Sequence, residues 1–477
     1  MRTIRHFQAL LGVLLLGACN SLDVLDLNNP GLENLVSNPT RSGIQVAATG
    51  LLIGGRGGPG GISSTNGYVM VLGLFGRESY NFDAADPRNI TELLIGPLLG
   101  GSPAFGANLF ALPYANIRNA NIVLGAVDNI VTDPTGTAGL TDEEKEATRG
   151  FAKTSQALEF LQLINTRDDN GLPIDVDIDP TGTPAPIVSK AEVFTHIVNL
   201  LDSAKTHLEA GGSAFFFPLS TGYDGFDTPS DFIKFNRALR ARVAVYLDDF
   251  DGALTALGES FLDTGAPLSD GVYHTFSTAS GDVTNGLFDP GNRAVYAHPS
   301  LEADAQPKGD GTPDDRFQEK VTNIAPQSIQ GLSSDLGFTM YNSTNAPIPI
   351  IRNEELILLR AEANIGKGDA ASLALAVTDI DFIRVNSGGL DPYSGAVTQP
   401  ALLDELLYNK RYSLMFEGGH RWIDMRHYGK LGDLPRDATP LDVDGTHRFS
   451  RMPFPTNECL ARDPEPAQGC TPEDGID

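Results

Sequence analysis

The chain has 477 residues, and 41% of them are hydrophobic, which is ample for a folded core. Its 61 acidic residues outnumber 34 basic ones, so the formal net charge is -27 at pH 7. This charge repels phosphate backbones, and no run of lysine and arginine offers a nucleic-acid surface, so a nucleic-acid partner is excluded. The 51 glycines and 31 prolines indicate long irregular connections between ordered elements.

Residues 1–18 have the features of a secretory signal peptide. Arg2 and Arg5 precede an apolar run, residues 9–18, which is shorter than the roughly 20 residues that span a bilayer. The run ends in Leu-Gly-Ala followed by Cys19, which resembles the lipobox of bacterial lipoproteins. We expect cleavage before Cys19, attachment of lipid to its thiol and anchoring to a membrane. The alternative is an ordinary cleaved signal that has a cysteine beside it by chance.

Residues 19–30 are short, polar and turn-prone, as expected of a tether, and the N-terminal half that follows is predicted to be helical. A helical pattern begins near Leu32, and further helices are predicted at 105–129, 142–166, 189–210, 230–248 and 251–263. Thr141 and Glu144 form a capping-box pattern at the start of the helix predicted at 142–166. Phe232, Phe235 and Leu239 share one helical face, which predicts core packing.

The rest of the chain divides into a loop-rich middle, about 264–349, and a second helical region. The middle is rich in Gly, Asp, Pro and Ser, and its pattern places no strand securely. Helices are predicted from Ile351 to the glycines at 366 and 368, at 369–385, and at about 400–417, packed antiparallel. We therefore predict one domain over 31–477, with a helical half at 31–263 and a C-terminal region at 350–477.

Cys459 and Cys470 lie close together in a tail that contains proline and glycine. An exported chain meets an oxidising compartment, so we expect the two thiols to form a disulfide. The alternatives are two free thiols or a metal pair, although no Cys-x-x-Cys motif or histidine cluster supports metal binding.

The segment from Asn409 to Leu431, NKRYSLMFEGGHRWIDMRHYGKL, closely resembles the C-terminal signature of the SusD/RagB family of nutrient-binding outer-membrane lipoproteins. The upstream segment PIPIIRNEELILLRAEANIGKGD and Met-Pro-Phe-Pro at 452–455 also resemble that family. Weaker resemblances lie at 114–121, 148–163 and 314–317. The signature positions are Glu417, His420, Arg421, Trp422, Asp424 and Arg426.

The resemblance implies a mainly α, SusD-like fold with tetratricopeptide-like helix pairs, long loops and a few short strands. It also implies a role as the lid of a SusC-like TonB-dependent outer-membrane transporter, which receives a glycan or another nutrient. The protein would then be anchored by lipid to the outer membrane and would face the exterior. In the family the signature segment is structural, and we expect Glu417/Arg421 and Asp424/Arg426 to be buried or half-buried pairs.

Metal and catalytic sites are weakly supported by the sequence. His420, Asp424 and His427 have helical spacing that zinc could use, but the pattern is not that of metalloproteases. Acidic residues between Glu302 and Asp315 could supply oxygen ligands to calcium, yet EF-hand spacing is absent and a solvated loop is favoured. The sequence contains no Gly-x-Ser-x-Gly elbow and no Walker motif. We predict no catalytic residue, no metal and no cofactor.

Ligand capture on a SusD-like protein would use loops that present aromatic and polar side chains. The candidates are Arg77, Tyr80, Asn81 and Phe82 in the loop after an early helix, followed by Tyr296 and Tyr341 in the middle region. The single tryptophan belongs to the signature, which argues against a platform rich in stacking rings and leaves a peptide cargo open. The alternatives to nutrient capture are a helical scaffold lipoprotein for envelope assembly and a lipid-anchored hydrolase.

Overall fold

A computed structural model describes residues 32–57, 60–101, 108–177, 182–291, 293–462 and 469–476. The predicted signal peptide, Cys19 and the tether lie outside the described residues. No helix in these described ranges is both long and apolar enough to cross a membrane. The fold is mainly α, as predicted, with short strands between the helices.

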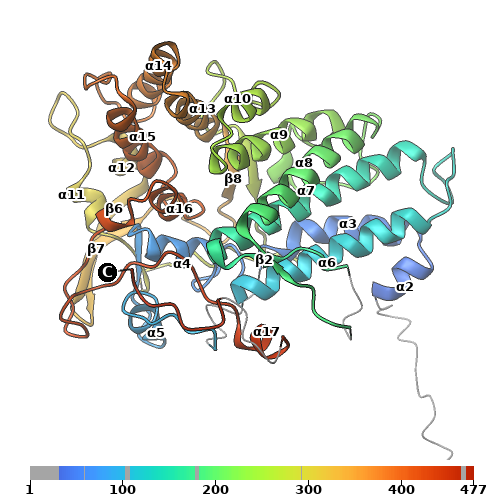
Figure 1. Cartoon of the computed structure of the whole chain (residues 1–477), viewed down its shortest axis with the longest axis horizontal. Coiled ribbons are helices and arrows are strands. Elements are labelled where there is room, and N and C mark those ends of the chain that lie inside the picture. The colour runs from blue at the N-terminus through green and yellow to red at the C-terminus, as the bar shows by residue number, and fades with distance from the viewer. Residues whose placement is uncertain are drawn as a thin grey trace, which may run out of the picture.

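The N-terminal half is a layer of long helices that lie side by side (Figure 1). The helices are α2 (Leu32–Ser37), α3 (Arg41–Gly54), α6 (Asn108–Asn129), α7 (Asp142–Arg167), α8 (Lys190–Glu209), α9 (Pro229–Tyr246) and α10 (Phe250–Gly258). Helix α7 packs against α6 and α8, and α9 packs against α8 and α10. Their shared core includes Phe151, Phe160 and Phe232, so the predicted face of α9 is confirmed. The helix predicted at 251–263 ends earlier, at Gly258.

The start of α7 shows how local sequence determines this layer. Thr141 accepts a hydrogen bond from the Glu144 backbone N–H, and the Glu144 carboxylate accepts one from the Thr141 N–H, which confirms the predicted capping box. The Glu144 carboxylate also pairs with Arg41 of α3 at 2.5 Å. One side chain therefore both begins α7 and joins it to the neighbouring helix.

A second helical group comprises α13 (Asn353–Lys367), α14 (Ala370–Asn386) and α15 (Gln399–Ser413). Helix α13 packs against α14 and α15, as the predicted three-helix arrangement requires. Gly368 ends α13 in the left-handed region, at φ +74°, which a residue without Cβ adopts without strain. Helix α15 stops at Ser413, short of the predicted 417, because Phe416 adopts φ +56° in the turn that precedes α16 (His420–His427).

Short strands that the sequence did not locate lie in the middle region and also in the N-terminal half. All of them form two-stranded antiparallel pairs. The pairs are β1 (Ser79–Asn81) with β5 (Val295–Ala297), β2 (Leu172–Pro173) with β3 (Ile187–Val188), β4 (Gly271–His274) with β8 (Ile348–Arg352), and β6 (Val321–Ile329) with β7 (Leu332–Phe338). The β6–β7 hairpin turns at Gln330 and Gly331, which both have positive φ.

Short helices surround a second hydrophobic core beneath the C-terminal signature. They are α4 (Tyr68–Phe75), α5 (Arg88–Thr91), α11 (Ser300–Ala303), α12 (Asp315–Lys320) and α16. Every residue of α4 is buried, and Phe75 packs against Trp422 with ring centroids 5.1 Å apart. Helix α4 was not predicted from the sequence, because a helix buried on all sides has no polar face and therefore no amphipathic pattern.

The C-terminal segment returns to the N-terminal half. His447 donates from its backbone N–H to Leu94, and Met452 donates to Thr166 at 2.8 Å. Glu473 and Leu98 exchange two backbone hydrogen bonds. Within this segment, α17 (Thr456–Leu460) carries Cys459, which forms the predicted disulfide with Cys470.

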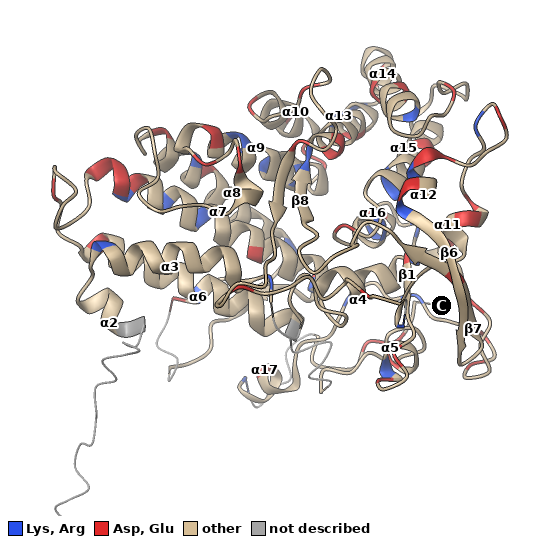
Figure 2. Cartoon of the chain, turned by 180° about the vertical axis from the view of Figure 1, so that it is seen from behind, with Lys and Arg blue, Asp and Glu red and all other residues tan. Residues whose placement is uncertain are grey.

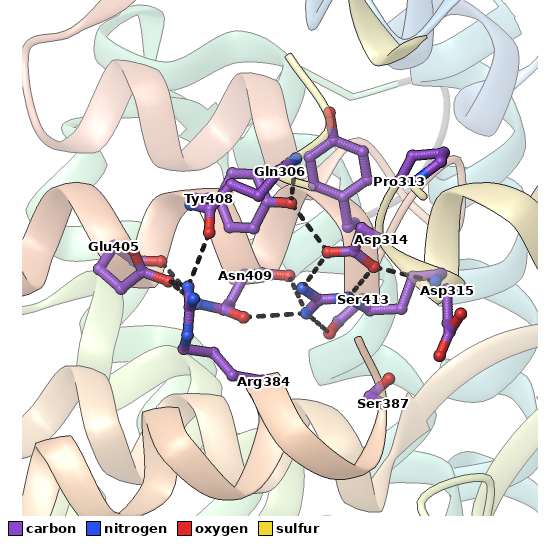
Figure 3. Close-up of polar contacts among 12 residues, drawn as sticks. Gln306, Pro313, Asp314, Asp315, Arg384, Ser387, Glu405, Tyr408, Asn409 and Ser413 are labelled. Carbon is purple, nitrogen blue, oxygen red and sulfur yellow. Dashed lines mark hydrogen bonds and ion pairs between the residues drawn. The ribbon is translucent and has the colours of Figure 1, made fainter. Parts of the chain in front are cut away.

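The acidic stretch from Glu302 to Asp315 is held by buried polar contacts with the second helical group (Figure 3). Asp314 pairs with Arg316 at 2.6 Å, and Arg316 donates to Asn409 Oδ1 and Ser413 Oγ, both at 3.0 Å. Asp304 pairs with Arg411, and Asp315 pairs with Lys308. Three of the five acidic residues in this stretch therefore pair with side-chain cations.

Candidate ligand-binding site

A cavity of about 490 Å³ lies beside α6, against the ends of β2 and β3 and the C-terminal segment. Its size falls within the range of cavities that bind small ligands, roughly 300–1,000 Å³. The lining combines apolar, aromatic and charged groups from segments far apart in the sequence. The lining residues are Phe110, Ala111, Tyr114, Arg118, Asn121, Ile122, Pro173, Val176, Asp177, Pro184, Ala185, Glu458 and Arg462.

Helix α6 supplies one wall of this cavity. Phe110, Tyr114, Arg118 and Ile122 recur every four residues, so they share one helical face. The rings of Phe110 and Tyr114 have centroids 4.7 Å apart, and the Tyr114 hydroxyl donates to the Pro173 carbonyl at 2.7 Å. Burial raises the pKa of Tyr114 well above its ordinary value, so the hydroxyl stays protonated at neutral pH. The aromatic wall is thereby fixed to the end of β2.

Charged groups border the cavity on the remaining sides. Arg118 and Asp177 are exposed, whereas Glu458 and Arg462 are half-buried and pair with each other at 2.5 Å. Arg462 also donates to the Ala185 carbonyl. Carboxylates, guanidinium groups and an amide beside aromatic rings can hydrogen-bond the hydroxyls of a ligand while its apolar faces contact the rings.

The six ligand-binding residues predicted from the sequence lie outside this cavity and are buried. Arg77, Tyr80, Asn81, Phe82, Tyr296 and Tyr341 are each at most 5% exposed. Tyr80 and Phe82 stack with centroids 5.2 Å apart, and Phe82 also contacts the Tyr296 ring. They belong to the second hydrophobic core, because β1 pairs with β5 and the rings fill the space beneath that pair.

The polar members of that group are also engaged inside the protein. Arg77 donates to the backbone carbonyls of Pro435 and His447, and Asn81 donates to that of Thr65. The Tyr341 hydroxyl donates to the Phe416 carbonyl at 2.7 Å. In this conformation the structure therefore assigns them to packing rather than to ligand contact.

The signature residues are buried or half-buried, as expected, but their predicted pairing is wrong. Glu417 pairs with Arg352 at 2.8 Å and with Lys320 at 3.1 Å, not with Arg421. Asp424 pairs with Lys410 at 2.7 Å, and Arg426 lies 3.3 Å from Asp168. Residues adjacent in the signature thus reach partners on other elements, which spacing within one segment does not reveal.

Two further contacts complete the signature. Trp422 is fully buried, and its indole N–H donates to the Phe449 carbonyl at 2.7 Å. The Arg426 guanidinium lies over the Trp422 ring, 4.5 Å from its centroid. The only tryptophan of the chain is therefore structural.

The residues considered for zinc have separate surroundings. Burial lowers the pKa of His420 to about 4, so this imidazole is neutral at pH 7. Asp424 faces Lys410, and His427 lies 3.2 Å from Asp248. Within the described ranges, no three His, Cys, Asp or Glu side chains are arranged to hold a metal ion.

Comparison with known proteins shows which fold this architecture represents. A SusD superfamily protein from Bacteroides vulgatus superposes with a TM-score of 0.63 at 14% identity, covering 90% of this chain and 98% of that one. The protein has the SusD-like fold. A SusD-like carbohydrate-binding protein from Bacteroides fragilis matches with a TM-score of 0.62 at 14% identity, over 82% of this chain and 87% of its own.

A third SusD-like protein, described as laminarin-binding, matches with a TM-score of 0.55 at 16% identity, over 88% of this chain and 96% of that one. No protein-family model matches the sequence, and no curated protein is similar to it. The three-dimensional arrangement therefore shows the SusD-like fold, although the overall sequence identity to these structures is low.

The cavity was not predicted from the sequence, although one signal for it was present. The segment 114–121 was identified as a weak resemblance to the SusD/RagB family, and it carries three of the lining residues. The helical face formed by Phe110, Tyr114 and Arg118 combines aromatic and charged groups, which a helix packed only into a core would not require. The other walls come from positions 173–177, 184–185 and 458–462, and only the fold brings these together.

Proposed function

We propose that this protein is a SusD/RagB-type lipoprotein that captures a glycan in the α6 cavity and delivers it to a SusC-like TonB-dependent transporter. The cavity carries the proposal, since it joins aromatic and hydrogen-bonding groups on a SusD-like scaffold. Similar structures described as carbohydrate-binding and laminarin-binding support a glycan as the ligand class. The lipobox-like sequence at Cys19 supports lipid anchoring. The resemblance to SusD/RagB lipoproteins supports a place at the outer membrane, facing the exterior. Binding and transfer require no bond cleavage, so we propose no enzymatic activity.

The charge of the protein narrows the class of glycan. The chain carries a formal net charge of -27, and acidic residues are distributed over helices at both ends of the molecule (Figure 2). A polyanionic glycan, such as a uronate or sulfate polymer, would be repelled on approach, whereas a neutral one would not. The proposed ligand is therefore a neutral oligosaccharide.

Calorimetric titration of the purified protein with neutral oligosaccharides, uronate oligosaccharides and short peptides tests the ligand class. We expect binding of at least one neutral oligosaccharide, and Tyr114→Ala or Arg118→Ala to weaken it about tenfold, roughly 1.4 kcal/mol. Arg293→Ala is the matched control, because Arg293 is also exposed but does not line the cavity. Absence of neutral-glycan binding would contradict the proposal. Wild-type affinity in both the Tyr114→Ala and the Arg118→Ala variant would also contradict it.

Recovery of the lipidated protein from native outer membranes tests the partner. Mass spectrometry should detect a TonB-dependent barrel in near-equal amount. Recovery of periplasmic or cell-wall proteins without a barrel would favour the scaffold alternative.

A further inference from the structure

The disulfide lies next to the α6 cavity. Glu458 precedes Cys459, Arg462 follows it by three residues, and both line the cavity. Cys459 and Cys470 are also partly buried against the same hydrophobic core as Phe110. The covalent bond therefore joins the segment that forms one cavity wall to a second position in the C-terminal segment.

Arg462 connects two walls of the cavity. Its Nε and Nη2 atoms donate to Glu458 Oε1 at 2.9 and 2.5 Å, and its Nη1 donates to the Ala185 carbonyl. The side chain is only 11% exposed, so solvent screens these interactions less than it screens a surface pair. The position of this guanidinium thus depends on where α17 holds it.

Few other contacts hold α17 in place. The helix has five residues, and none of them is buried. An isolated helix of this length is not stable in water. Two backbone hydrogen bonds also hold the surrounding segment. The Thr456 N–H, at the start of α17, donates to the Gly100 carbonyl at 2.9 Å, and the Phe454 N–H donates to the Gly469 carbonyl at 2.8 Å. Within the described residues, the disulfide is the covalent cross-link that holds the segment carrying Arg462.

We propose that the Cys459–Cys470 disulfide is a positioning element of the ligand cavity, which holds Arg462 against Ala185 so that high-affinity binding requires the oxidised pair. The proposal rests on the proposed function at this cavity. Reduction by a dithiol converts the S–S bond to two thiols while the reductant becomes a disulfide, and it frees α17 from this constraint. The protein would thus gain full ligand affinity only in an oxidising compartment.

The test compares the wild type with Cys459→Ala/Cys470→Ala, Arg462→Ala and the triple variant. The affinity is measured by calorimetry for the neutral oligosaccharide that binds the wild type most tightly. We expect the disulfide-free variant and Arg462→Ala each to lose about tenfold in affinity, and the triple variant to lose little more, because the two changes act through one side chain. Leu373→Ala is the control, since it removes buried packing in α14 far from the lining residues and should leave affinity unchanged.

Hydrogen exchange of the same proteins gives a readout that needs no ligand. Removal of the disulfide should accelerate exchange at 183–188 and 456–462 but not in α13 or α14. Unchanged affinity together with unchanged exchange at 183–188 would overturn the proposal. If the wild type binds no glycan in the panel, the proposed function fails, while the exchange data still decide whether the disulfide positions this wall.

Discussion

The C-terminal signature and the N-terminal helical half both bury charged groups, but they compensate the charges differently. In the signature, Lys410 lies between the carboxylates of Glu362 and Asp424, at 2.8 and 2.7 Å, and all three are nearly inaccessible. In the N-terminal half, buried Glu159 receives a hydrogen bond from the Asn116 amide at 2.7 Å, and its other carboxylate oxygen has no partner among the described residues. The first arrangement therefore depends on the lysine and on both carboxylates, whereas we expect the second to tolerate a neutral residue in place of Glu159.

The largest effect is expected from removing the central cation of the signature. Lys410→Ala leaves two buried carboxylates facing each other, so the free energy of unfolding should fall by about 3–5 kcal/mol. Denaturant unfolding at neutral pH measures it. Lys367→Ala is the control, because its pair with exposed Asp251 is at the surface and should contribute little to stability. A similar loss of unfolding free energy in Lys410→Ala and Lys367→Ala would contradict the special role of the buried lysine.

A smaller effect of opposite sign is expected for Glu159. Burial raises the pKa of its carboxyl to about 7, against 4.5 for the unperturbed group. The folded state therefore retains a proton that the unfolded state releases, so stability is lost as the pH rises from 4.5 to about 7. Glu159→Gln should stabilise the protein by about 3 kcal/mol above pH 7, and by almost nothing near pH 4. Urea titrations across this range measure the difference, and a gain independent of pH would contradict the assignment.

The smallest effect concerns the cap that begins α7. Thr141→Ala removes the hydroxyl that accepts the Glu144 N–H, and it should cost about 1 kcal/mol of stability, measured by thermal unfolding. The matched change, Ser189→Ala, removes the equivalent capping-box hydroxyl of α8, where the carboxylate of Glu192 pairs with no arginine of the described residues. We expect Ser189→Ala to cost no more than Thr141→Ala. The reverse order would show that the pair with Arg41 does not strengthen the α7 cap.

Sequence patterns predicted the elements whose determinants are local. The capping box at Thr141, the apolar face of α9 and the glycine at 368 all act within a few residues, and the corresponding helices have nearly the predicted bounds. The hairpin β6–β7 was missed, because most of the β6 side chains are exposed or half-buried and show no regular apolar alternation.

Long-range contacts explain why the predicted ligand residues are buried and why the cavity was missed. Tyr80 was interpreted as a loop residue, but it pairs with Tyr296 across more than 200 positions of the chain. No local pattern reports such a pairing. The cavity likewise depends on Phe110, Pro173 and Arg462, which only the folded chain brings together.

The return of the C-terminal segment to the N-terminal half has a consequence for the order of folding. The backbone N–H and C=O of Leu98 pair with Glu473, and the Thr166 carbonyl accepts a hydrogen bond from the Met452 N–H. Because a polypeptide is synthesised from its N-terminus, these groups lack those partners until almost the whole chain is available. Closing such distant contacts is slow, so the protein should depend on being kept unfolded, or shielded from aggregation, until residues 452–473 arrive.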